Sequence, residues 1–138
     1  MVNNYESSSD SAAKVFLDLN CCTVTAEHNI RICRFLIEQL NKFGIKTELL
    51  IASNPPFHIY QHKRKNNLNR LLYALAEVDV DKSAPISDIP VIPDDNSILI
   101  TADINNVTSD YMTVIYTGKA KNIKHANVIY ADERRRKL

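Results

Sequence analysis

The sequence predicts an α/β fold: a three-layer sandwich built on a mostly parallel sheet of about five strands, with helices on its faces. Three observations lead to this class. Short apolar runs recur along the chain, an amphipathic helical pattern separates the first two runs, and the turn from that helix into the second run is short, as a βαβ unit requires. The length of 138 residues is that of one domain.

Polar segments set the expected boundaries of this domain. Residues 1–13 include the serine-rich stretch SSSDS and are expected to form a disordered tail. Residues 14–133 are the predicted domain, and residues 134–138 are a basic tail. Within the domain, residues 79–96 hold three prolines and five aspartates. They are expected to form a long acidic connection that lies against the sheet or over its edge.

The first strand and helix are predicted from residues 14 to 44. KVFLDL, residues 14–19, is a nearly continuous apolar run, which is typical of a strand buried on both faces. Thr25 is expected to cap the next helix, with Glu27 in its first turn and Gly44 at its C-terminal end. The predicted apolar stripe of this helix consists of Ile30, Cys33, Leu36, Ile37, Leu40 and Phe43.

The other elements follow in the same way. IKTELLIAS is the second predicted strand, and a second helix is expected from about His58 to Val78. The apolar side of that helix consists of Ile59, Leu68, Leu71, Leu72 and Leu75. SILITAD, YMTVIYTG and NVIYAD are three further strands, with a short helical turn in KAKNIKHA before the last. YMTVIYTG alternates in polarity, which predicts a strand at the edge of the sheet.

Composition narrows the class of protein without naming a ligand. The formal net charge of +1 implies neither nucleic acid nor membrane, and no apolar run approaches the roughly 20 residues of a membrane span. The three cysteines include an adjacent pair and make a poor disulfide framework, which indicates a reducing compartment, nuclear or cytoplasmic. Two glycines leave no material for a phosphate-binding loop. We therefore expect no cofactor, no metal ion, no membrane partner and no small-molecule substrate.

Two carboxylates raise the hypothesis of a nuclease. PIN- and NYN-like nucleases place an Asp at the end of the first strand and further acids at later strand ends, because Mg²⁺ needs several oxygen ligands. Asp18 and Asn20 fit the first position, and Asp103 fits a later one. The remaining acids fit poorly, since the second helix begins with basic and amide residues. The other interpretation of Asp18 is that it bonds loop amides near the first helix.

The second half of the chain carries a resemblance to a known family. Its elements are the strand ILIT, the polar excursion ADINNVTSD, the strand TVIYTG, the linker KNIKHA and the final strand NVIYA. In this order they resemble the end of an anticodon-binding-like domain, of the type found in class II aminoacyl-tRNA synthetases and in a nuclear-receptor coactivator. The similarity covers roughly residues 14–136, and the insertion at residues 79–96 departs from it. The resemblance implies a non-enzymatic domain of a gene-regulation or RNA-processing complex, and it transfers no binding residue.

A basic segment is the predicted surface for RNA. The stretch HIYQHKRKNNLNR carries the candidate contacts, which are Tyr60, Lys63, Arg64, Lys65 and Arg70. Basic side chains beside an aromatic ring can contact phosphates and unstacked bases. A solvated helix face next to its acidic counter-charge is the alternative interpretation.

Two further patterns concern protein partners. LNRLL, residues 68–72, matches the LxxLL box that docks into nuclear-receptor grooves, but the same leucines are expected to bury the second helix against the sheet. The predicted edge strand offers Tyr111, Thr113 and Ile115 as a protein interface. We therefore expect a homodimer or a complex with another protein. The two function hypotheses are a non-enzymatic protein-interaction scaffold that also contacts RNA, and a metal-dependent ribonuclease.

Overall fold

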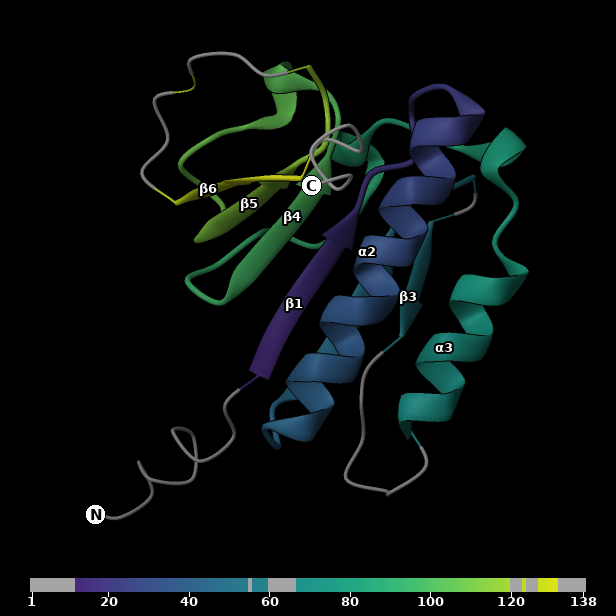
Figure 1. Cartoon of the computed structure of the whole chain (residues 1–138), viewed down its shortest axis with the longest axis vertical. Helices are drawn as coiled ribbons and strands as arrows, with labels where there is room; N and C mark the ends of the chain where they lie inside the picture. The colour runs from purple at the N-terminus through teal and green to yellow at the C-terminus, as the bar shows by residue number, and fades with distance from the viewer. Residues whose placement is uncertain (1–11, 55, 60–66, 120–122, 124–126, 132–138) are drawn as a thin grey trace, which may run out of the picture.

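Six strands form one sheet in the order β3-β2-β1-β4-β5-β6, with both α-helices beside it (Figure 1). The computed structural model describes residues 12–54, 56–59, 67–119, 123 and 127–131. The strands are β1 (Ala12–Leu17), β2 (Lys46–Ile51), β3 (Phe57–Ile59), β4 (Ser97–Thr101), β5 (Thr113–Tyr116) and β6 (Val128–Tyr130). The helices are α2 (Thr23–Lys42) and α3 (Asn67–Glu77), and the 3-10 turns are η1 (Val80–Lys82), η2 (Ile86–Asp88) and η3 (Ile104–Asn106).

The sheet is parallel except at one edge. β1 pairs in parallel with both β2 and β4, and β5 and β6 continue in the same direction. Among the strands of the described residues, only the short β3 runs antiparallel, against β2. The predicted α/β class with a mostly parallel sheet is therefore confirmed, and β3 is an addition that the sequence patterns did not predict.

The two α-helices lie together on one face of the sheet. Side chains alternate between the two faces of a strand, so Val15 and Leu17 of β1 point to the helices while Phe16 points away. The helices contribute Cys33, Ile37, Leu71 and Leu75 to this core. Leu71 is fully buried, and Leu68 and Leu72 pack against the same cluster. The core interpretation of LNRLL is therefore confirmed, because a receptor groove needs these leucines exposed.

The other face of the sheet is covered by connections. The buried residues there include Phe16, Leu50, Leu99 and Val114 from the strands and Ile89 from the long connection. This connection is also bonded to the sheet edge region, since the Ala84 N–H donates to the carbonyl of Ala52 over 3.1 Å. Residues 79–96 thus lie against the sheet, as expected. Within the described residues this third layer contains 3-10 turns and no α-helix.

The ends of the first helix differ in part from their prediction. α2 begins at Thr23 with Cys22 as its N-cap, so Thr25 lies inside the helix and does not cap it. Gly44 has a φ of +74°, and the Ile45 N–H donates to the carbonyl of Leu40, as in a Schellman end. The predicted glycine end is confirmed. Phe43 is exposed and does not belong to the buried stripe, because the helix ends before it.

The second helix is shorter than predicted. α3 begins at Asn67, and residues 57–59 form strand β3 instead of its first turn. His58 is on this strand, where its Nε2 lies 2.6 Å from Oε2 of Glu48 on β2. The expectation that the second helix starts near His58 is therefore wrong, because residues 57–59 pair with β2 instead.

The predicted edge strand is an interior strand. β5 pairs with β4 on one side and with β6 on the other, so its backbone groups are not open to a partner. Tyr111 and Ile115 are buried and Thr113 is partly buried. The proposed protein interface at these three residues is therefore wrong. The alternating polarity of YMTVIYTG predicted an edge strand with one face in solvent. In the structure, connections cover that face, and β6 pairs with the open side of the strand.

The chain ends are only partly described. β1 begins at Ala12, so the expected tail of residues 1–13 is two residues too long, and residues 1–11 lie outside the described part. The basic tail of residues 134–138 also lies outside it. In the part of the chain that the structure describes, no helix is both long and apolar enough to cross a membrane.

Candidate functional site

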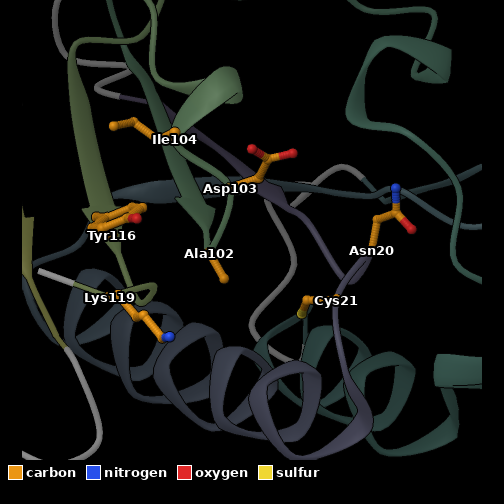
Figure 2. A pocket seen from close by; sticks show the side chains of 7 residues that line it. All are labelled: Asn20, Cys21, Ala102, Asp103, Ile104, Tyr116 and Lys119. Carbon is orange, nitrogen blue, oxygen red and sulfur yellow. The ribbon is translucent and has the colours of Figure 1, made fainter. Parts of the chain in front are cut away.

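The strand order creates one natural place for a ligand. From β1 the chain goes to β2 on one side, and it later returns to β4 on the other side of β1. Connections diverge at such a point and leave a crevice beyond the carboxyl ends of the strands. A cavity of about 330 Å³ lies there, lined by Asn20, Cys21, Ala102, Asp103, Ile104, Tyr116 and Lys119 (Figure 2).

Asp18 lies at the same edge of the sheet, where both of its carboxylate oxygens accept hydrogen bonds. Its side chain is only 1% exposed. Oδ2 accepts from the hydroxyl of Thr101 at 2.6 Å and from the amide of Asn106 at 3.0 Å. Oδ1 accepts from the backbone N–H of Asn20 at 3.0 Å. The interpretation that Asp18 bonds loop amides is confirmed, and this carboxylate joins the ends of β1 and β4 to η3.

A second set of buried bonds extends this network to α2 and β5. The side-chain amide of Asn29 donates to the carbonyl of Asp18 at 3.0 Å. The hydroxyl of Thr117 donates to the other end of the same amide, Oδ1 of Asn29, at 2.6 Å. From the residue before Asn29, Nε2 of His28 donates to the carbonyl of Ala131, just after β6, at 2.9 Å. Polar groups satisfied in this way give a buried site a single arrangement.

The close packing of Gly118 shapes the crevice wall. A Cβ at this position would lie 2.4 Å from the carbonyl oxygen of Ala102 and 2.6 Å from the hydroxyl of Tyr116. Tyr116 is 2% exposed, and its ring meets that of Tyr130 edge to face at 6.1 Å. Burial and the neighbouring charge of Asp103 raise the pKa of the Tyr116 phenol. The hydroxyl is therefore a protonated donor at neutral pH.

The adjacent cysteines have opposite chemical character. Cys21 lines the crevice, and burial together with the charge of Asp18 raises the pKa of its thiol to about 11. Cys22 is exposed, and the hydroxyl of Thr25 at 3.2 Å, with backbone N–H groups, lowers the pKa of its thiol. Cys33 is buried in the core, where burial raises the pKa. The expectation that Cys33 is a core residue is confirmed.

The two predicted acids reach the same edge of the sheet in different states. Asp103 follows β4 and is exposed, whereas Asp18 is buried in the network. The Asp103 carboxylate accepts from the N–H of Asn105 at 2.9 Å and so caps η3. Among the described residues, no group of three or more His, Cys, Asp or Glu side chains could hold a metal ion. The third carboxylate that the nuclease hypothesis needs is therefore not found in this part of the chain.

Of the five predicted RNA contacts, Arg70 belongs to the described residues. Tyr60, Lys63, Arg64 and Lys65 lie outside the described residues. Arg70 is exposed on α3. Lys119, Tyr116 and the Asp18 partners Thr101 and Asn106 were not predicted, because the nuclease pattern is recognised by carboxylates and none of these four residues carries one. The available signal was that polar residues end each parallel strand, and those ends meet at one edge of the sheet.

No protein-family model, no curated protein and no solved structure matches this chain.

Proposed function

We propose that this domain is a non-enzymatic binding module of a gene-regulation or RNA-processing complex, nuclear or cytoplasmic, and that RNA binds at the carboxyl edge of its sheet. The resemblance to anticodon-binding-like domains belongs to this proposal. A scaffold of this kind also needs a protein partner or a second copy of the chain. The β5 interface does not serve that role, since β5 is an interior strand.

The hydrogen bonding of the Asp18 carboxylate is the observation that supports a non-enzymatic function. A carboxylate that binds Mg²⁺ directs free oxygen lone pairs at the ion. Here three donors, from Thr101, Asn106 and Asn20, already occupy both oxygens of Asp18. A buried carboxylate whose two oxygens both accept hydrogen bonds supports the fold, and its release for metal binding would cost those bonds. The geometry therefore favours a structural role for Asp18.

The distribution of charge supports RNA as the ligand. Residues 119–138 contain seven Lys and Arg residues and two acidic residues, although the whole chain has a formal net charge of only +1. Lys119 follows β5 and Ala131 follows β6, so the described ends of this segment lie at the carboxyl edge. Clustered Lys and Arg residues attract the phosphates of a single strand and release its counterions.

Two charge-matched triple variants test where RNA binds. Lys119, Lys121 and Lys124 are replaced by Gln in one variant, and Lys63, Arg64 and Lys65 in the other. Fluorescence anisotropy with a labelled single-stranded RNA is then measured at several salt concentrations. The first variant should weaken binding and reduce the slope of log K against log salt by about 2, because each lost phosphate contact in a single strand contributes about 0.7. An effect confined to the second variant would move the site to residues 63–65. RNA that fails to bind the wild-type chain would refute the RNA proposal.

The same RNA serves to separate the binding module from a nuclease. Incubation of the wild-type chain with Mg²⁺ or Mn²⁺ should leave the RNA intact. Metal-dependent cleavage that disappears in the Asp18→Asn variant would establish the enzyme instead.

A further inference from the structure

Four polar side chains around the crevice have hydrogen-bonding capacity that the described residues do not use. The ammonium group of Lys119 makes no ion pair or hydrogen bond with a described residue. Oδ2 of Asp103 accepts no hydrogen bond from a described residue, because the turn uses only Oδ1. The side chain of Asn20 also makes no bond in the described part of the chain, where only its backbone N–H is used. These groups come from loops after β1, β4 and β5.

The hydroxyl of Tyr116 is the most informative of the four. Its side chain is 98% buried, since its exposed fraction is 2%, yet no described residue pairs with the hydroxyl. In the described residues, every side-chain polar atom that is completely shielded from solvent has a partner. The Tyr116 hydroxyl therefore has accessible surface, and Tyr116 is one of the residues that line the crevice (Figure 2). A donor that a buried ring holds at the surface of a cavity, with no partner among the described residues, is suited to a ligand oxygen.

We propose that this crevice holds one ribonucleotide of a single-stranded RNA, and that it distinguishes ribose from deoxyribose. The ammonium of Lys119 and the hydroxyl of Tyr116 bind phosphate oxygens. The free carboxylate oxygen of Asp103 accepts the hydrogen of the ribose 2′-hydroxyl. This assignment rests on the proposed RNA-binding function and names the unit that the crevice recognises.

The chemistry of the lining favours this ligand over a simple anion. One cation and one carboxylate face the same small cavity, so a bare phosphate would meet attraction from Lys119 and repulsion from Asp103. A ribonucleotide supplies both an anionic phosphate and a neutral hydroxyl donor. The 2′-hydroxyl is the group through which proteins tell RNA from DNA at one position. A carboxylate acceptor can use that donor, whereas deoxyribose leaves the carboxylate without a partner.

Three matched oligonucleotides isolate the 2′-hydroxyl. Labelled oligouridine, oligodeoxyuridine and 2′-O-methyl oligouridine of equal length are titrated with the full chain. Oligouridine should bind about tenfold more tightly than the other two, as expected for loss of one charge-assisted hydrogen bond. Asp103→Asn keeps an acceptor for the η3 turn but removes the charge. It should bring the ratio of RNA to DNA affinity close to one, mainly by weakening RNA binding.

Two further variants test the phosphate contacts. Lys119→Gln should weaken the binding of RNA and of DNA to a similar extent. It should also lower the slope of log K against log salt by about 0.7. Tyr116→Phe removes only a hydroxyl and should weaken the binding of both RNA and DNA severalfold. Matched controls are Lys42→Gln at the far end of α2, Tyr73→Phe on the exposed side of α3, and Asp95→Asn before β4. None of the three controls should change affinity.

The outcomes separate the two proposals. RNA binding that is unchanged in Asp103→Asn, Lys119→Gln and Tyr116→Phe would overturn the assignment of the crevice and leave the RNA-binding function in place. Equal affinity of the wild-type chain for RNA and DNA would overturn recognition of the 2′-hydroxyl. A chain that binds none of the oligonucleotides would overturn both proposals.

Discussion

The hydroxyl of Thr101 donates a hydrogen bond of 2.6 Å to Oδ2 of Asp18, across 83 residues of sequence. Both side chains are buried, and they stand at the carboxyl ends of the neighbouring parallel strands β4 and β1. This bond joins the ends of two strands whose following loops line the crevice. It also engages the carboxylate whose position at a strand end first raised the hypothesis of a nuclease.

Loss of this bond should destabilise the domain. Thr101→Val keeps the shape of the side chain but removes the donor, so a buried carboxylate loses one of its three partners. The free energy of unfolding should fall by about 1–3 kcal/mol, the usual cost of an unpaired buried polar group. Urea denaturation measures the change. Thr113→Val on β5 is the control, since its hydroxyl makes no bond with a described residue. Equal stability of the two variants would contradict the structural role of Asp18.

Gly118→Ala should also be destabilising, through a steric clash. The added methyl group would lie 2.4 Å from the carbonyl oxygen of Ala102, which is backbone and cannot easily move. We expect a loss of about 1–3 kcal/mol in the free energy of unfolding, as for other overpacked sites. The methyl group would also approach the Tyr116 hydroxyl, so RNA affinity should fall as well. Thermal unfolding and anisotropy measured on the same sample check both effects.

The three thiols should react in a fixed order. Alkylation by iodoacetamide needs the thiolate, so Cys22, with its lowered pKa and full exposure, should react first. Cys21, whose pKa is about 11, should be slow near neutral pH, and buried Cys33 should react only on unfolding. Mass spectrometry of peptides after short exposures gives the order. Thr25→Val should slow the alkylation of Cys22, because the hydroxyl of Thr25 is the main cause of the lowered pKa of its thiol. A faster reaction at Cys21 would contradict this account.

Asp94 should titrate below its usual range. The ammonium of Lys14 lies 2.8 Å from its carboxylate, and the hydrogen bond between them lowers the pKa of Asp94. Because the folded pKa is the lower one, the pair stabilises the fold above the ordinary Asp pKa near 3.8, and this contribution is lost as pH falls through the lowered value. NMR titration of the carboxyl carbon measures the shift. Lys14→Gln should bring the pKa of Asp94 most of the way back to its ordinary value. The effect on the free energy of unfolding should be small, because the pair is partly exposed.

The fold was predictable where neighbouring residues in the chain carry the signal. The alternation and apolar runs of SILITAD and NVIYAD predicted β4 and β6, and the spacing of Cys33 and Ile37 predicted the buried side of α2. Gly44 ended that helix as expected, because a left-handed φ is a local requirement. The prediction was wrong at residues 57–59, where pairing with β2 outweighed a helical pattern.

The candidate site was predictable only in part. Asp18 and Asp103 were recognised as polar residues at strand ends, which is where they lie. The role of Asp18 was not decided by its own segment, because its partners Thr101 and Asn106 lie more than 80 residues away in the sequence. Tyr116 and Lys119 have no short motif, and they join the crevice only because β5 lies beside β4.

The sequence by itself determined which segments become strands and helices and which side chains must be buried, because these properties follow from periodicity and from local backbone preference. The tertiary structure decided the order of the strands, the burial of Tyr111 and Ile115 in an interior strand, and the pairing of Asp18 with Thr101. The physical reason is that hydrogen bonds and contacts between distant segments depend on how the sheet assembles. That assembly left Lys119, Asp103 and the Tyr116 hydroxyl around one crevice.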